Sequence, residues 1–363
     1  MLIVGSITEA MLYLSFSILM GTFILRIVPN SYRPEINVPK GVLMLSIAGI
    51  ALFSFFPVLQ LITHLYQDIG FLQTLKSILF TFEVGKSWVF TFFVSNVFFI
   101  YIVWVDLSTK KKYSYFGLLI IFILILSLGW SSHASSYYPL KGFLTHTTHF
   151  LSVSVWVGIL IVVSWFSTNK ANWFNFLKWF TPVAMICFFT TAITGLILMS
   201  FVLDFKDYTN SWMIPYGQAL LFKHLMIIPL LGYAFINSFL MKKRLKSNPE
   251  YNPIPWTKAE SLIIFLIFSI TGTLGQQSPP HETNIATSGV SSLFHILYQG
   301  LFNENMKLSF IFNINGVSAL LLAVVFFILS FISFIRKSSS YLSFILFLLS
   351  VLNFYLAIML SLR

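Results

Sequence analysis

The sequence predicts an all-α, polytopic membrane helix bundle with about ten transmembrane helices and both termini outside. Its 363 residues are 57% hydrophobic and only 9% charged, whereas about a quarter of the residues in a typical soluble domain are charged. Apolar stretches of about 20 residues, long enough to cross a ~30 Å hydrocarbon layer as a helix, recur along the whole chain. Open strands would leave backbone groups unsatisfied in lipid, so each stretch predicts a helix.

Ten apolar stretches therefore predict one spanning helix each. The first stretch lacks a basic region and a small-residue cleavage site, which indicates a retained span and not a signal peptide. A shorter apolar stretch at 69–82 predicts an interfacial segment before the third span. In chain order the predicted spans are 7–28, 41–63, 87–107, 114–132, 145–166, 179–201, 217–240, 259–276, 309–335 and 340–362.

The basic residues indicate the orientation. Most of the 22 Lys and Arg residues lie in every second connection, for example Arg26, Arg33 and the run 110–112. Cytoplasmic loops carry this excess, so both termini are expected outside. The net charge of +11 then reflects topology and attraction to anionic headgroups. Membrane lipid is the expected partner, nucleic acid is not, and a multi-pass protein of the cytoplasmic membrane is predicted.

The chain lacks a stretch polar and long enough for a soluble domain. We expect an eight-helix membrane domain over 1–276, an extracellular loop over 277–308 and two additional transmembrane helices over 309–363. Cys187 is the single cysteine, which excludes an intrachain disulfide and a thiolate metal cluster.

All seven histidines are predicted on the outer side, and histidine is the commonest protein ligand for transition metals. His133 ends the fourth span, and His146 and His149 open the fifth. The last two, three residues apart, share a helix face and could close on one Cu or Zn ion. A dozen residues separate them from His133, so all three could converge. The predicted metal ligands are His133, His146, His149 and His224.

Simpler roles remain open for each histidine. Interfacial histidines can snorkel toward headgroups, and His64 lies where a helix meets water. His281 and His295 lie in the outer loop, where water alone could surround them. Lys223 directly precedes His224, and an adjacent cation would discourage metal binding there unless the lysine is neutral or paired.

Other residues offer weaker signals for a metal path. Met199, Met213 and Met226 lie toward the outer end of their spans, where thioether sulfur could bind Cu(I) or simply fill space. Thr194 belongs to a small, hydroxylated stretch that favours helix packing or a polar path. Glu260 opens the eighth predicted span, where stabilisation of the helix dipole explains an acid. Motifs of nucleotide or hydrolytic enzymes are absent from the sequence, so an enzyme is not expected.

The chain resembles the copper resistance protein D family over about residues 120–280. In the most specific motif, His149 is followed seven residues later by Trp156-Val157-Gly158. The sequence departs from many relatives at Ile159, where they have glycine, and at His146, where they often have an acid. The further matching residues are Gly129, His133-Ala134, Thr194-Gly195, Tyr216-Gly217, Lys223, Asn237, Glu260 and Pro279-Pro280.

The resemblance implies copper handling at the cytoplasmic membrane, usually described as uptake. We expect copper import, with a copper ion captured by outward-facing histidines and passed through the helix bundle. A separate extracellular or periplasmic copper-binding protein could deliver the ion. Two alternatives stay open: a membrane haem b protein or electron carrier, and a copper-binding assembly factor that does not transport.

Overall fold

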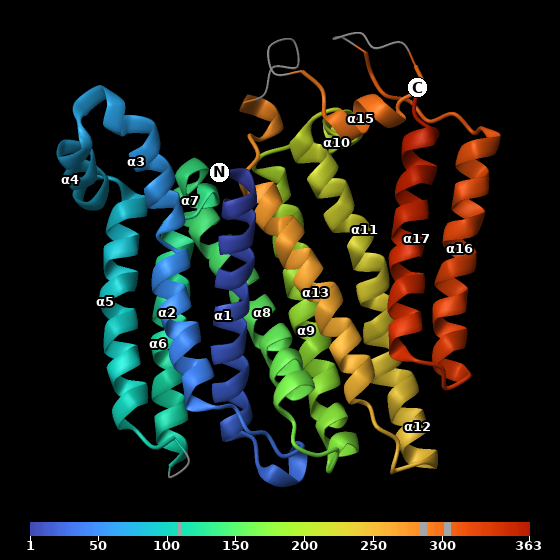
Figure 1. Cartoon of the computed structure of the whole chain (residues 1–363), viewed down its shortest axis with the longest axis horizontal. Coiled ribbons are helices and arrows are strands. Elements are labelled where there is room, and N and C mark those ends of the chain that lie inside the picture. Colours follow the sequence, from blue (N-terminus) through green and yellow to red (C-terminus); the bar gives the residue numbers. More distant parts are fainter. Residues whose placement is uncertain (108–109, 283–288, 301–305) are drawn as a thin grey trace. The chain divides into compact units, whose positions relative to one another are not determined.

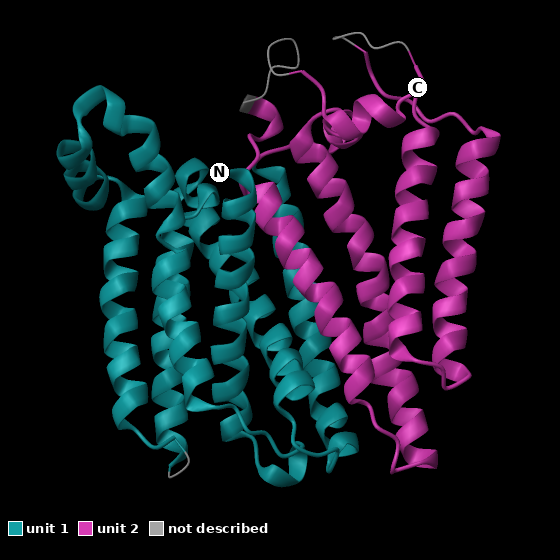
Figure 2. Cartoon of the chain, in the orientation of Figure 1, with its two compact units in different colours: residues 1–201 teal, residues 202–363 magenta. Residues whose placement is uncertain are grey.

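The computed structural model describes residues 1–107, 110–282, 289–300 and 306–363. Within these ranges ten helices are long and apolar enough to cross a membrane, which confirms the all-α polytopic fold (Figure 1). The chain divides into two compact units, Met1–Phe201 and Val202–Arg363 (Figure 2). This boundary falls inside the membrane domain expected over 1–276, and that domain organisation stays a prediction.

The first unit contains six of the spans. The second span is interrupted at Ser54–Phe55, where α2 ends and α3 begins. The apolar segment predicted at 69–82 is helical, and its Ile78 packs against Val58 and Ile62 of α3. The elements are α1 Leu2–Ile27, η1 Asn30–Tyr32, α2 Lys40–Phe53, α3 Phe56–Ile69, α4 Phe71–Thr81, α5 Glu83–Trp104, α6 Lys111–Trp130, α7 His133–Tyr137, α8 Pro139–Phe166 and α9 Trp173–Ser200.

Helices α1 and α8 approach each other closely in the core of this unit. Gly21 and Gly158 meet where the two backbones cross, and a Cβ on either glycine would overlap backbone atoms of the other helix. Phe16 and Phe150 pack edge to face on the same interface, with ring centroids 5.2 Å apart. Small residues allow such close approach in membrane bundles, which explains the glycine of the Trp156-Val157-Gly158 motif.

The second unit contains the remaining four spans. Helix α11 continues through one π-helical segment, labelled η3, into α12. Part of the predicted extracellular loop 277–308 lies outside the described residues, and the described part includes the short helix α15. The elements are η2 Phe205–Asp207, α10 Tyr208–Ser211, α11 Pro215–Phe235, η3 Ile236–Leu240, α12 Met241–Ser247, α13 Ile254–Gly275, η4 Pro280–Glu282, α15 Ser292–Leu297, α16 Ile314–Ile335 and α17 Ser340–Leu360.

The last two helices pack onto α11 and α13 through α17. Tyr355 stacks on Phe222 with ring centroids 4.2 Å apart, and its hydroxyl donates to Gln218 Oε1 at 2.6 Å. Gln218 is only 3% exposed, and buried polar groups need such partners. The contact therefore satisfies a polar side chain inside the apolar interface of α11 and α17.

Candidate metal site

A tight corner between α7 and α8 positions the first two histidines. Ser132 caps α7, and its Oγ accepts a hydrogen bond from the backbone N–H of Ser135 at 3.3 Å. Gly142 lets α8 approach the carbonyl of Ala134, where any Cβ would clash. His133 is the first residue of α7 and is exposed. Figure 1 shows α7 at the same end of the first unit as the start of α1.

His146 has a buried ring nitrogen that no described residue contacts by a hydrogen bond. Its Nδ1 atom is buried without a hydrogen-bond partner among the described residues, and its ring stacks on Phe150 at a centroid distance of 6.4 Å. His133 begins α7, the short helix that packs against α8, which carries His146. Buried polar groups normally have a hydrogen-bond partner, so this nitrogen makes His146 a candidate ligand.

His149 is held by the next helix in the chain. Its Nδ1 lies 3.0 Å from Thr194 Oγ1 on α9. The Thr194 hydroxyl donates its proton to the carbonyl of Thr190 at 2.6 Å, so Oγ1 accepts from Nδ1–H of the imidazole. This assigns the lone pair of the neutral ring to Nε2. Such contacts fix the tautomer and orientation of histidine ligands.

Gly195 makes room for the same ring. A Cβ at this position would lie 3.3 Å from His149 Cε1 and 3.7 Å from Nδ1. From the sequence, the Thr194-Gly195 stretch was expected to serve helix packing or a polar path. In the structure Thr194 instead hydrogen-bonds the His149 imidazole, and Gly195 leaves space for it. This role was missed because 45 residues separate the hydrogen-bonded partners, and the sequence carries no signal of that contact.

The structure brings the predicted ligands together only in part. Within the described ranges, no group of three or more His, Cys, Asp or Glu side chains is close enough to hold a metal ion. A single site shared by His133, His146 and His149 therefore stays a prediction. His64 is exposed on α3, and His295 is exposed on α15. His281 places Nδ1 3.1 Å from the carbonyl oxygen of Val202.

His224, the fourth predicted ligand, belongs to the second unit. Its Nδ1 lies 2.6 Å from the hydroxyl of Tyr208 in α10. Burial raises the pKa of Tyr208 above its usual value. Tyr208 therefore keeps its proton at neutral pH and acts on His224 as a phenol. Met213 and Met226, two of the three candidate thioethers, are buried in the same unit.

A second polar cluster of this unit corrects the interpretation of Glu260. Because α13 begins at Ile254, Glu260 lies in its second turn and does not stabilise the first. Its side chain is buried, with 5% exposure, and accepts a hydrogen bond from Asn237 Nδ2 at 2.8 Å. The expectation of dipole stabilisation was wrong because the helix extends five residues beyond the predicted start of the span.

Asn237 belongs to η3, the π-helical segment. Its Nδ2 also donates to the carbonyl of Trp256 at 3.2 Å, while its Oδ1 is buried without a partner in the described part of the chain. Single π-helical turns inside longer helices are frequent at functional sites. The Asn237–Glu260 pair is therefore a further candidate site within the second unit.

Comparison with protein-family models finds a match for part of the chain. Residues 174–274 match the family model described as copper resistance protein D. The matched segment runs from α9 to α13 and includes Thr194, His224, Asn237 and Glu260, whereas His133, His146 and His149 precede it. Neither a curated protein nor a solved structure matches the chain.

Proposed function

We propose that this chain, whose residues 174–274 match the copper resistance protein D family, imports copper across the cytoplasmic membrane. In this proposal a copper ion is the cargo, captured at the outer end of the first unit by His133, His146 and His149. The ion then passes through the helix bundle, with His224 as a further ligand.

One observation carries the proposal: His146 buries an unpartnered imidazole nitrogen on α8, the helix against which α7, with His133 at its start, is packed. Leaving such a group unpaired costs about 1–3 kcal/mol, a cost that a bound metal ion would remove. Imidazole suits copper in either common oxidation state, and its affinity follows ligand type and geometry. The exposure of His133 supports its role as the first contact for an arriving ion.

His149 supports the next step. The Thr194 hydrogen bond places the lone pair on Nε2, which is the form of the ring that binds a metal. The residue lies one helical turn beyond His146, so an ion could transfer along one face of α8. Inward movement of a cation gains about 2.3 kcal/mol per charge for each 100 mV of membrane potential, so the proposed import needs no ATP-binding domain.

The proposal also includes a supply route. A separate extracellular or periplasmic copper-binding protein would deliver the ion to the exposed His133. Copper bound to such a donor would not be captured by competing ligands outside the cell.

Uptake of radioactive copper into proteoliposomes tests the proposal. With an inside-negative potassium diffusion potential, we expect saturable lumenal accumulation by the wild type. A variant combining His133→Ala, His146→Ala and His149→Ala should lose it, whereas His64→Ala, on the exposed face of α3, should not.

The alternatives give different results in the same preparation. Saturable binding without lumenal copper would replace import by an assembly role. A Soret band in the purified protein, lost in the triple variant, would indicate haem ligation instead. Equal accumulation by wild type and triple variant would remove the proposed capture site.

A further inference from the structure

The connection between α1 and α2 is a firmly anchored strap, residues 28–39. It is bonded to residues 166–179, at the junction of α8 and α9 in the same unit. Two backbone hydrogen bonds join the segments: the N–H of Asn37 donates to the Phe166 carbonyl, and the N–H of Thr168 donates to the Glu35 carbonyl, both at 2.9 Å. Three side chains donate to strap carbonyls: Asn172 to Asn30 at 2.9 Å, Asn175 to Ser31 at 3.2 Å and Trp179 to Tyr32 at 2.8 Å.

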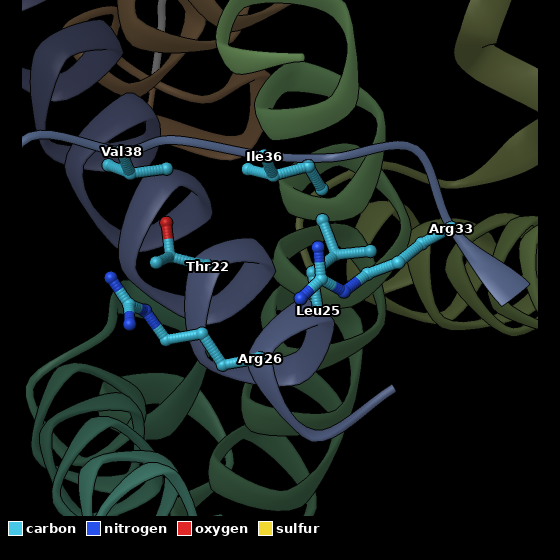
Figure 3. Close-up of a pocket in the computed structure, with 6 residues that line it drawn as sticks. All are labelled: Thr22, Leu25, Arg26, Arg33, Ile36 and Val38. Atoms are coloured by element: carbon cyan, nitrogen blue, oxygen red, sulfur yellow. The ribbon is translucent and has the colours of Figure 1, made fainter. Parts of the chain in front are cut away.

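A cavity lies between this strap and the last turns of α1. Its volume is about 70 Å³, well above the roughly 10–15 Å³ that one water molecule needs. Figure 3 shows the Arg26 guanidinium beside Thr22 and the Arg33 guanidinium beside Leu25. The two arginines are the charged members of the lining, which consists of Thr22, Leu25, Arg26, Arg33, Ile36 and Val38.

Some N–H donors of the two guanidinium groups make no hydrogen bond within the described part of the chain. Arg26 Nε is buried without a hydrogen-bond partner among the described residues, although the charge of Asp106 acts on this side chain. Arg33 donates from Nε to the Val28 carbonyl and from one terminal nitrogen to the Pro34 carbonyl, both at 3.2 Å. These two bonds hold Arg33 in place and leave donors of its planar fork for another acceptor.

The electrostatics of the pocket favour an anion. Burial first, and then the like charge of Arg26, lower the pKa of Arg33, while Glu35 opposes the shift. The Glu35 carboxylate is engaged by Asn169 Nδ2 at 3.0 Å. Lys111 adds a further positive charge at this end of α1, where its Nζ donates to the Ile27 carbonyl at 2.8 Å. Two like charges at one cavity repel each other, and an anion between them would reverse that cost.

We propose that this pocket binds the phosphate group of an anion, held between Arg26 and Arg33. Arginine matches phosphate through paired N–H donors, and the unpartnered Nε of Arg26 supplies one such donor. The pocket is formed by the last turns of a spanning helix and the connection that follows it. The end of a spanning helix lies at the depth of the lipid headgroups. The phosphate belongs either to an anionic phospholipid or to inorganic phosphate in solution.

Native mass spectrometry of the purified full chain tests the proposal without copper. One arm adds phosphatidylglycerol, with neutral phosphatidylcholine for comparison, and the other adds inorganic phosphate. We expect one retained phosphatidylglycerol or one bound phosphate per wild-type chain. Arg26→Gln combined with Arg33→Gln should weaken this binding at least about tenfold, since a hydrogen bond to a charged group contributes about 1.5–3 kcal/mol.

Two further variants make the result specific. Lys112→Gln removes an exposed charge next to Lys111 and should leave the affinity unchanged. Arg26→Lys with Arg33→Lys keeps both charges without the planar fork and should bind with intermediate affinity. This variant still tests the site if the double glutamine variant does not fold. Retention in the lipid arm alone identifies a headgroup site, and binding in the phosphate arm alone identifies a site for free phosphate. Absence of binding in both arms, or equal binding by the double glutamine variant, overturns the proposal.

Discussion

Thr194 Oγ1 lies 3.0 Å from His149 Nδ1 and donates its own proton to the Thr190 carbonyl at 2.6 Å. A hydroxyl whose proton is committed can only accept, so α9 determines which nitrogen of His149 carries the lone pair. One threonine thereby connects the segment that matches the copper resistance protein D family with a predicted copper ligand outside that segment.

Thr194→Val should weaken copper binding about 10- to 100-fold, the usual effect of losing a residue that orients a metal ligand. Valine keeps the shape of threonine but cannot accept the Nδ1–H bond. Competition titration with a copper chelator of known affinity measures the change. Thr194→Ser keeps the hydroxyl and should restore most of the affinity. Equal weakening by serine and valine would show that Thr194 acts only through packing.

His146→Phe should separate stability from copper binding. The phenyl ring can retain the contact with Phe150 and removes a buried nitrogen that has no partner, so the free energy of unfolding should stay equal or rise by up to about 1–3 kcal/mol. Copper affinity should fall at the same time. Thermal unfolding and the chelator titration give the two values. His64→Phe, at an exposed position of α3, should leave copper affinity unchanged. A His146→Phe protein with wild-type copper affinity would exclude His146 as a ligand.

Gly158→Ala should destabilise the first unit. The new Cβ would lie 2.8 Å from the backbone nitrogen of Gly21 and would overlap the carbonyl of Ser17. Both obstacles are backbone atoms of α1, so the helices must separate, at a cost of about 1–3 kcal/mol or more. Gly41→Ala meets nothing within 4 Å and serves as the control. A thermal midpoint for Gly158→Ala equal to that of Gly41→Ala would contradict the close crossing of α1 and α8.

Tyr355→Phe should destabilise the second unit by about 1–3 kcal/mol, because it leaves the buried Oε1 of Gln218 without its donor. The hydroxyl of Tyr355 now donates to that oxygen at 2.6 Å. Thermal unfolding in detergent measures the loss. Tyr341→Phe removes a hydroxyl from a side chain that is 70% exposed and should have little effect. Equal midpoints for the two variants would indicate that α11 and α17 do not depend on this bond.

The ten spans could be predicted because lipid leaves a chain few alternatives, whereas their ends could not be located. The fifth helix begins at Pro139 and not at 145, and the sixth begins at Trp173 and not at 179. Polar residues such as Lys141 and Lys178 interrupt the apolar pattern there. These helices continue through the polar residues because long side chains can reach the interface while the backbone stays helical.

The candidate site was predictable as residue types and not as contacts. Histidine spacing placed His146 and His149 on one helix face, and the structure keeps them on α8. The unpartnered nitrogen of His146, the Thr194 bond and the burial of Glu260 all depend on neighbours far along the chain. Side-chain environment follows from tertiary packing, and a single sequence does not contain that information.

The anchored strap of the first unit also restricts how this protein can move. Its bonds to the α8–α9 junction join the ends of four spanning helices, α1, α2, α8 and α9, at one end of the unit. A conformational cycle that opened this end would have to break several of them at once. Motion costs less where the helical ladder is already interrupted, as at Ser54–Phe55 between α2 and α3. The first unit thus has a strongly hydrogen-bonded connection at one end and an interrupted helix in its second span.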